Sequence, residues 1–263
     1  MITDERVAPS ALPDSLLAQG RYWATTEQLE QLTGERGAVL RTSLSRLRKE
    51  GRLFSPARGL YVIVPPEYRS WRVLPAEWFA DALMKHLGRA YYVGFLSAAS
   101  MHGAAHQHPQ TTRIVTDRYT ADRSIERVSL RFTTVRDIAS VATEQRTVPT
   151  GYLTVSTREA TLADLVWQPK LGGGISNVAT VMKEIGPVDS EALARAAQLR
   201  GRLTARRLGW LLQRFRPEVD VHWLRVIARP REGDPSLLVP GAERGQLDQD
   251  WWVRVNTAVE PDV

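Results

Sequence analysis

The hydrophobic pattern in the first fifty residues predicts two short helices joined by a tight turn. Thr25 and Gln28 have the spacing of a capping box, in which each residue satisfies a backbone N–H at the start of a helix. The segment that follows carries apolar residues at helical spacing, Leu29 and Leu32. Residues 33–37 contain two glycines and therefore predict the turn that ends this first helix.

The second predicted helix covers residues 38–50 and has one apolar face. Its leucines recur at i, i+4 and i+7, as one face of a 3.6-residue helix requires, at Leu40, Leu44 and Leu47. Gly51 stands where a glycine commonly ends a helix, because the residue there adopts a left-handed conformation. We therefore expect a leucine face that is buried and an opposite face that meets solvent.

A β-hairpin is predicted directly after these helices. Residues 53–55 and 60–64 have strand composition, and the segment 56–59 joins them with Pro and Gly. The order helix, turn, helix, hairpin in about 50 residues is that of a winged helix-turn-helix. Pro65 and Pro66 then mark the end of the module, so we expect a DNA-binding domain over 13–66 and a second domain over 67–263.

The remainder of the chain mixes helix and strand patterns, which predicts an α+β fold class. A short helix over 14–20 is expected at the start of the first module. Beyond it, helical patterns cover 77–87, 91–101, 157–167, 175–185, 190–199 and 204–215. Strand-like segments lie at 111–116, 128–134 and 148–156, and a terminal strand or docked tail lies at 251–255. From residue 229 onward the high content of Pro, Gly and charge predicts mostly coil.

Composition and charge narrow the function classes. The 263 residues carry a net charge of +6, which mildly favours a polyanionic partner. The chain has no cysteine, which excludes disulfides, thiolate zinc sites and a cysteine nucleophile. No stretch has the apolar length of a membrane span or a signal-peptide core. We expect a cytoplasmic protein without a membrane partner.

The positive charge of the first module is concentrated on the second helix and the hairpin. Residues 36–58 contain seven Arg or Lys and only one acid, Glu50. The solvent face opposite the leucines carries Ala38, Thr42, Ser45 and Lys49, with Arg41 and Arg46 beside it. A helix of this kind fits the major groove of DNA, which is about 12 Å wide.

Each of these residues has an expected role on double-stranded DNA. Arg41 can form a paired hydrogen bond with guanine, and Thr42 and Ser45 can meet bases or phosphates. Ala38 lies in the same N-terminal half of the helix, which reaches base edges in helix-turn-helix proteins. Phosphate contacts position the protein, and their expected donors are Arg46, Lys49 and Arg52. Arg58, at the hairpin tip, is the expected wing contact, with a phosphate or with the minor groove. The alternative is a solvated basic helix with no ligand.

A second basic stretch lies near residues 192–216, where no acid interrupts seven arginines. Its leucines supply a buried side for two helices. The arginines then predict either a solvated face or an auxiliary basic surface for a nucleic acid or an acidic protein, formed by Arg195, Arg200, Arg202, Arg206, Arg207 and Arg214. A charge run does not distinguish these partners.

Candidate catalytic and metal sites are weak in this sequence. The histidines His102, His106 and His108 could hold zinc, but Gly103 and Pro109 predict a helix end and a loop there. His102 is better explained as a residue at a helix C-terminus. The glycines at 172–174 lack the flanking residues of a phosphate loop and predict a connector between helices. We therefore expect no metal, no cofactor and no enzymatic activity, with a spatially assembled site as the alternative.

Two segments of the chain resemble the AbiEi family of antitoxins. The first is Tyr91-Tyr-Val-Gly-Phe-Leu-Ser-Ala-Ala-Ser-Met-His102-Gly103, followed by Gln107, Pro109 and Thr112-Arg-Ile-Val-Thr116. The second is Arg158-Glu-Ala-Thr-Leu-Ala-Asp164-Leu-Val. The likeness covers about residues 20 to 215. It implies an N-terminal winged helix followed by a C-terminal antitoxin domain, and it implies no catalytic role for His102 or Asp164.

The resemblance implies a type IV toxin–antitoxin function. Such an antitoxin represses its own operon by binding promoter repeats and counteracts a nucleotidyltransferase-like toxin encoded beside it. The first alternative is a stand-alone transcription regulator whose C-terminal body binds a ligand or dimerises. The second is an enzyme. A monomer on two repeats and a dimer on one palindrome are both compatible with the sequence.

Overall fold

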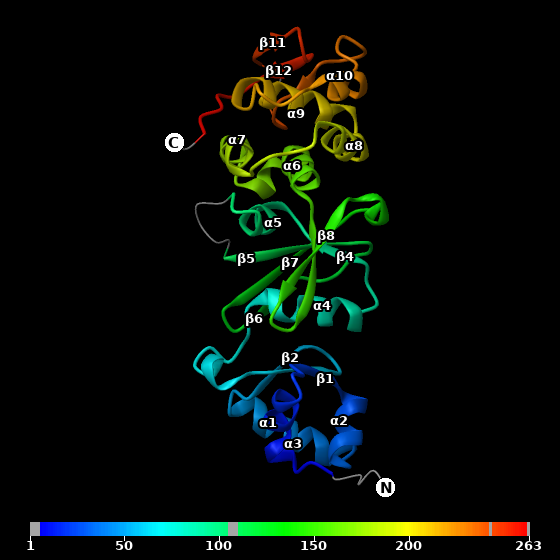
Figure 1. Cartoon of the computed structure of the whole chain (residues 1–263), viewed down its shortest axis with the longest axis vertical. Coiled ribbons are helices and arrows are strands. Elements are labelled where there is room, and N and C mark those ends of the chain that lie inside the picture. The colour runs from blue at the N-terminus through cyan, green and yellow to red at the C-terminus, as the bar shows by residue number, and fades with distance from the viewer. Residues whose placement is uncertain (1–5, 105–109, 242–243, 262–263) are drawn as a thin grey trace.

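The chain is arranged in three tiers along one long axis (Figure 1). This computed structural model describes residues 6–104, 110–241 and 244–261. The N-terminal tier ends near Val64, the central tier contains a large β-sheet, and the C-terminal tier, from residue 157 onward, contains helices and a small sheet. The expected α+β fold class is confirmed by this mixture of helices and sheets.

The N-terminal tier contains the predicted helices and hairpin. Its elements are α1 (Leu12–Ala18), β1 (Trp23–Thr25), α2 (Thr26–Thr33), α3 (Gly37–Lys49), β2 (Leu53–Ala57) and β3 (Leu60–Ile63). The strands form an antiparallel sheet in the order β1-β3-β2. Leucines from α1, α2 and α3 are buried together under this sheet, which gives the tier an apolar core of its own.

The β2–β3 hairpin also belongs to a second core, which it shares with the central tier. Phe54 of β2 and Phe79 of α4 (Ala76–His86) pack edge to face with ring centroids 5.1 Å apart. Val62 and Val64 are fully buried in the same cluster, together with residues of the central sheet. Side chains on both sides of Pro66 therefore form one core, so the two tiers are packed together and not merely tethered.

The central tier is built on a six-stranded mixed sheet. Its strands are β4 (Tyr91–Val93), β5 (Thr111–Thr116), β6 (Arg123–Ile125), β7 (Val128–Thr134), β8 (Thr143–Val148) and β9 (Gly151–Ser156), in the order β6-β7-β5-β4-β9-β8. β4 pairs antiparallel with β5 and parallel with β9. β4 thus lies in the interior of the sheet, with neighbours on both sides.

The two faces of this sheet are covered by different helices. Because successive side chains of a strand point to opposite faces, Val93 and Ile114 join the core under α4, whereas Tyr92 and Val115 join the core under the later helices. α4 lies between the sheet and the N-terminal tier, and α5 (Phe95–Met101) lies on the opposite side (Figure 1). The sheet therefore separates two continuous apolar cores.

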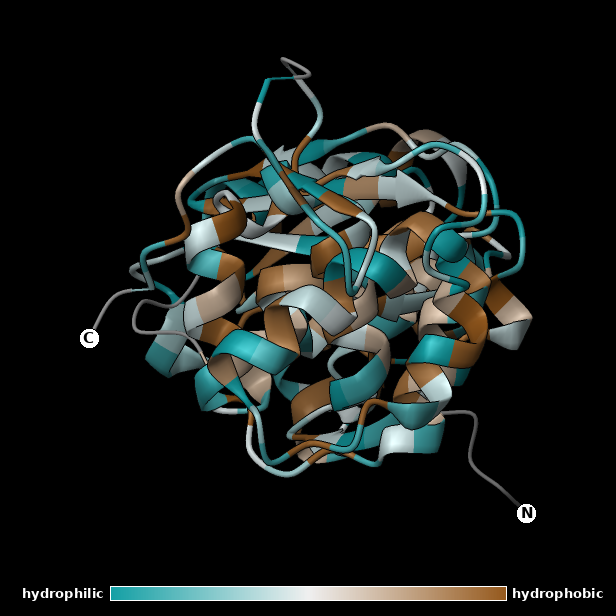
Figure 2. Cartoon of the chain, turned by 90° about the horizontal axis from the view of Figure 1, so that it is seen from above, coloured by the Kyte–Doolittle hydropathy of each residue, from teal (hydrophilic) through white to brown (hydrophobic). Residues whose placement is uncertain are grey.

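The C-terminal tier is a packed set of helices capped by short strands. Its helices are α6 (Arg158–Trp167), α7 (Ile175–Glu184), α8 (Ser190–Arg200), α9 (Arg202–Phe215) and α10 (His222–Ala228). Its strands are β10 (Ser236–Leu237), β11 (Gln246–Asp248) and β12 (Val253–Val255). Seen along the long axis, hydrophilic and hydrophobic positions alternate along the helical ribbons (Figure 2), as amphipathic helices around a core require.

Most predicted helices are confirmed, but the prediction of one helix over 91–101 is wrong at its start. The first three residues form β4, Gly94 is extended, and α5 begins at Phe95. An apolar run has no periodicity that separates a buried strand from a buried helix, and here the sheet selects the strand. The structure also adds β6, β8 and α10, which the sequence did not predict. After residue 229, β10 and β11 occupy positions where coil was expected, and β12 lies within 251–255, where a terminal strand or docked tail was expected.

No helix within the described residues is both long and apolar enough to cross a membrane.

Candidate nucleic-acid interface

Both ends of α2 are set by local interactions. Thr25 accepts a hydrogen bond from the Gln28 backbone N–H, and the Gln28 side chain accepts one from the Thr25 N–H at 2.9 Å, so the predicted capping box is confirmed. Gly34 ends α2 in a left-handed conformation, with φ of 73°. These caps fix where α2 begins and where the turn toward α3 starts.

The leucine face of α3 is buried as predicted, and the opposite face is open to solvent. Leu40, Leu44 and Leu47 are at most 3% exposed. All six residues predicted on the outer face are exposed or half-buried and line one shallow hollow: Ala38, Arg41, Thr42, Ser45, Arg46 and Lys49. Within the described part of the chain, no acidic side chain forms an ion pair with the cations of this hollow, Arg41, Arg46 and Lys49. These cations are therefore available to a ligand.

Two other predicted DNA contacts are held differently. Arg52 donates to Asp14 at 2.9 Å and to the Ser10 carbonyl at 2.6 Å, so its guanidinium ties α1 to the end of α3. Arg58 is exposed, but the turn that carries it is attached to the central tier. His86 is 2.9 Å from the Arg58 carbonyl, and Arg123 donates to the Pro56 carbonyl at 2.9 Å. The hairpin tip is thus anchored through its backbone.

A contact that the sequence did not predict closes the C-terminal end of α3. Arg72 donates to the carbonyls of Arg48 and Lys49, at 3.2 and 2.7 Å. The Arg48 carbonyl also accepts from the Gly51 N–H at 3.0 Å, so the guanidinium adds a second donor there and complements the helix dipole. Arg72 lies more than 20 residues away along the chain, so no local sequence pattern predicts this cap.

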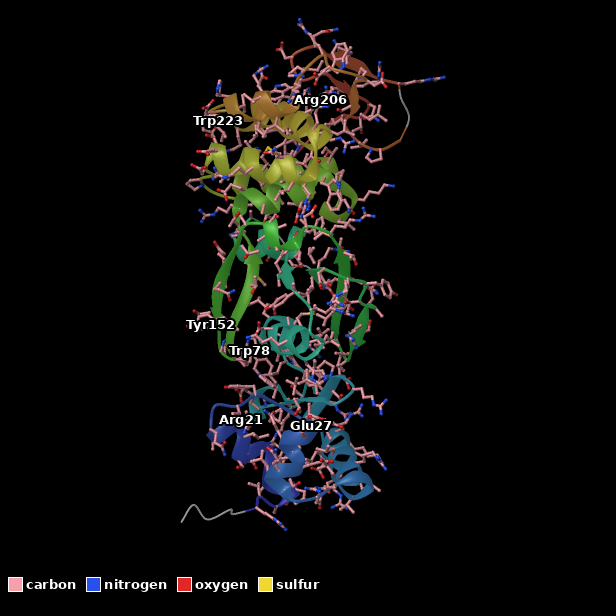
Figure 3. All side chains as sticks on the ribbon, turned by 90° about the vertical axis from the view of Figure 1, so that its right-hand side faces the viewer. Arg21, Glu27, Trp78, Tyr152, Arg206 and Trp223 are labelled. Atoms are coloured by element: carbon pink, nitrogen blue, oxygen red, sulfur yellow. The ribbon has the colours of Figure 1, made fainter. Side chains whose placement is uncertain are left out.

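The hypothesis of a second basic surface is wrong for three of its six arginines. Arg206 is fully buried and donates to the carbonyls of Ala228, Arg229, Glu232 and Asp234, at 2.6 to 2.9 Å (Figure 3). Arg207 is buried and donates to the Leu237 carbonyl. Arg200 is buried in an ion pair. Arg206 and Arg207 point inward because the C-terminal segment offers them backbone acceptors, whereas Arg200 points toward the Asp164 carboxylate.

The other three arginines of that set are exposed but engaged. Arg195 pairs with Glu191 at 2.5 Å, Arg202 pairs with Glu232 at 2.8 Å, and Arg214 stacks on Trp210. An uninterrupted run of arginines therefore does not form a continuous basic face here.

The central and C-terminal tiers match a known family. The model of the AbiEi antitoxin C-terminal domain matches residues 92–214, from β4 to the last turn of α9. Residues 92–214 form an AbiEi antitoxin C-terminal domain. The match confirms the resemblance seen in the sequence, and it supports a role as an antitoxin of a toxin–antitoxin system.

The whole chain also resembles a solved structure. The crystal structure of the RV2827C protein from Mycobacterium tuberculosis superposes with a TM-score of 0.66, at 16% sequence identity. The alignment covers 95% of this chain and 92% of that chain, so the likeness of fold extends beyond the AbiEi domain to the N-terminal tier. No curated protein matches the chain in sequence.

The AbiEi domain contains a buried polar network that joins its sheet to its helices. The Tyr92 hydroxyl of β4 donates to Asp164 of α6 at 2.8 Å, and the Arg200 Nε of α8 donates to the other carboxylate oxygen at 2.5 Å. Arg200 also donates to the Tyr92 hydroxyl and lies over the Trp167 ring. Burial raises the pKa of Asp164, while the Arg200 guanidinium opposes that rise. The Tyr92 hydroxyl, both carboxylate oxygens of Asp164 and two guanidinium nitrogens of Arg200 are hydrogen-bonded, which indicates a structural role.

Both ring nitrogens of His102 are in contact with polar groups of the AbiEi domain. His102 caps the C-terminus of α5 as predicted, with Nε2 2.8 Å from the Ser156 carbonyl and Nδ1 3.1 Å from an Arg146 guanidinium nitrogen. Burial lowers its pKa and so opposes the cationic form that a helix dipole would favour. His106 and His108 lie outside the described residues. Among the residues that are described, no group of three His, Asp or Glu could hold a metal.

Proposed function

We propose that this chain is a DNA-binding antitoxin that represses its own operon and counteracts a nucleotidyltransferase-like toxin. The AbiEi domain supports the antitoxin role. The observation that carries the DNA-binding part is the exposed face of α3, where Arg41, Arg46 and Lys49 are free of ion pairs with the described residues. The family suggests a regulator and not an enzyme.

In this proposal, residues 13–66 act as a winged-helix module and α3 is its recognition helix. The order β1-α2-α3-β2-β3 and the buried leucine face support this interpretation. Arg41 lies in the N-terminal half of α3, where it would read a guanine through two hydrogen bonds. Lys49 lies at the C-terminal end, where it would meet a phosphate.

The anchored hairpin changes what the wing would contribute. Because backbone carbonyls at its tip are bound by His86 and Arg123, the hairpin is committed to the central tier, and only the Arg58 side chain remains for DNA. We therefore propose that base recognition rests on α3. The same packing holds α3 in a set orientation relative to the AbiEi domain.

The test is a titration of the full-length chain with upstream promoter DNA and with scrambled DNA at two salt concentrations. Arg41→Ala should weaken specific binding by about 1–3 kcal/mol and relax the preference at one base pair. Lys49→Ala should weaken binding to both DNAs similarly and reduce the salt slope by about one. Arg195→Ala, which removes an exposed arginine of α8, is the control and should change neither.

Equal effects of Arg41→Ala on both DNAs would show that α3 does not read bases through Arg41. No preference of the unmodified chain for the promoter would contradict the repressor proposal. Rescue of growth on co-expression with the toxin gene tests the antitoxin part separately, because it does not require promoter binding.

A further inference from the structure

The first turn of α3 exposes a large apolar side chain. Val39 is 60% exposed, and among the described residues before residue 65 no other large hydrophobic side chain is exposed. The leucines of α3 are buried in the core of the tier. Valine also forms helices less well than alanine or lysine, because its branched side chain has restricted rotamers in a helix. Neither core packing nor helix formation therefore accounts for a valine at this position.

Val39 stands on a ridge of α3 that borders the free cations. Side chains three and four residues apart are neighbours on a helix surface, so Val39, Thr42 and Arg46 follow one another along one side of the outer face. Thr42 and Arg46 line the shallow hollow of α3, and Val39 precedes Thr42 by about 4.5 Å along the helix axis, at 1.5 Å per residue. α3 lies in the part of the N-terminal tier that is away from the central sheet (Figure 1). Val39 is thus placed at the rim of the proposed DNA-binding face.

The hydroxyl hydrogen of Thr42, the next residue on this ridge, is engaged within the helix. Thr42 Oγ1 donates to the Ala38 carbonyl at 3.0 Å, and a threonine has only this one side-chain donor. The Thr42 side chain is exposed, so its γ-methyl group is the part that is not committed to the helix. The sequence predicted that Thr42 meets a base or a phosphate, and this hydrogen bond favours an apolar contact with a base.

Thymine is the base that an apolar ridge fits in the major groove. Its C5-methyl group is the apolar group that base pairs display there, whereas their other groups are hydrogen-bond donors and acceptors. Methyl groups of Val39 and Thr42 would exclude water from a thymine methyl group, and they would leave the amino group of a cytosine at the same place without a partner.

The charges beside the ridge favour DNA as the molecule that covers it. Arg41, Arg46 and Lys49 form no ion pair with any residue that the structure describes, and they lie next to the ridge on the same exposed face. Cations of this kind attract the phosphates of a nucleic acid and contribute affinity without reading sequence. An apolar ridge bordered by free cations therefore fits duplex DNA better than an apolar protein surface.

We propose that Val39 and the methyl group of Thr42 contact thymine methyl groups, so that the operator carries thymine within the segment that α3 reads. This inference rests on the proposed function, because that function places α3 in the major groove. Arg41 lies on the opposite side of the outer face from Val39, since two residues turn a helix by about 200°. Guanine and thymine would therefore be read at different base pairs, and Val39 would determine specificity without contacting a phosphate.

The test compares thymine with deoxyuracil, which lacks only the C5-methyl group. Promoter duplexes that carry deoxyuridine in place of each thymine in turn are titrated with the full-length chain by fluorescence anisotropy. Removal of a contacted methyl group should raise Kd about fourfold, which is the effect of one methyl-sized apolar contact. This rise should occur at one or two thymine positions, and replacement of the other thymines should leave Kd unchanged.

Variants at two positions separate the methyl groups from the hydroxyl. Val39→Ala should lower the preference for thymine over deoxyuracil to less than about twofold at its base pair. Thr42→Ser keeps the hydroxyl that donates to Ala38 but removes the methyl group, so it should lower the preference, whereas Thr42→Val keeps a methyl group and should retain it. Ser45→Ala is the control, because it removes a hydroxyl from the same exposed face and should leave the preference unchanged. Circular dichroism confirms that each variant is folded.

The inference is overturned if no thymine methyl group affects binding, or if Val39→Ala leaves the preference intact. Loss of the preference in Thr42→Val and its retention in Thr42→Ser would show that the hydroxyl makes the contact, and would overturn the role of the methyl group. An unmodified chain that prefers the promoter to scrambled DNA, but binds thymine and deoxyuracil equally, contradicts this inference alone and leaves the repressor proposal standing. An unmodified chain with no preference for the promoter contradicts both.

Discussion

Replacing Asp164 with asparagine should destabilise the AbiEi domain strongly, because it strands a buried cation. The side chains of Asp164 and Arg200 are only 1% and 7% exposed, and they form an ion pair of 2.5 Å. The amide of the variant would keep the shape and one acceptor but remove the negative charge. Breaking one partner of a buried pair costs about 3–5 kcal/mol, and the retained acceptor places this variant near the lower value.

The Tyr92→Phe variant shows how much stability is lost when an uncharged partner in the same network is removed. Its hydroxyl donates to Asp164 and accepts from Arg200, so its loss leaves one lone pair and one donor unsatisfied. The expected cost is about 1–3 kcal/mol. Asp164→Asn should therefore cost more than Tyr92→Phe.

Urea unfolding of the full-length chain, followed by circular dichroism, measures both values if the slopes of the transitions agree. The double variant Asp164→Asn with Arg200→Met removes both charges. It should be more stable than the sum of the single effects predicts, by about 1–3 kcal/mol. A cost below about 1 kcal/mol for Asp164→Asn, or strict additivity in the double variant, would refute the argument that the pair is electrostatically coupled in the core.

Two further variants test other contacts. Because burial lowers the pKa of His102 in the folded state, that state binds fewer protons than the unfolded chain below about pH 6.5. Stability should therefore be full above that pH and fall on acidification, and thermal unfolding of His102→Gln should show a weaker fall between about pH 7 and 5; an identical pH profile would contradict this. Gly209→Ala should lower the free energy of unfolding in urea by about 1–3 kcal/mol, because the added Cβ would overlap the Trp251 ring that packs against α9. The control Ala196→Gly on α8 should lower it by only about 1 kcal/mol, which is the difference in helix propensity.

Local sequence patterns were sufficient to predict the helices and the exposed α3 face of the N-terminal tier. The capping box at Thr25 and the leucines of α3 act within one or two helical turns, so the sequence alone predicts both the helix and its exposed face. The exposed position of Arg41 follows from that periodicity. Whether this face binds DNA stays a prediction, which the proposed titration addresses.

Predictions from the sequence pattern were wrong where the interaction partners of a residue are distant in sequence. The apolar pattern of Tyr91–Val93 predicted part of a helix. The segment is a strand because β5 and β9, which follow later in the chain, pair with it on both sides. The arginines of α9 were predicted to contribute to a basic surface. Arg206 instead donates to backbone carbonyls 22 to 28 residues later in the chain. Neither set of partners has a signature near the residue that uses it.

The sequence by itself therefore determined the short-range features of this protein: helix starts, helix faces, the α+β class and the likeness to AbiEi antitoxins. Only the tertiary structure decided which charges are free. An arginine on α3 and an arginine on α9 look alike in the chain, but one faces solvent and the other is surrounded by backbone carbonyls. The reason is physical: helical periodicity is a property of neighbouring residues, whereas burial and charge pairing depend on which distant segments the fold brings together.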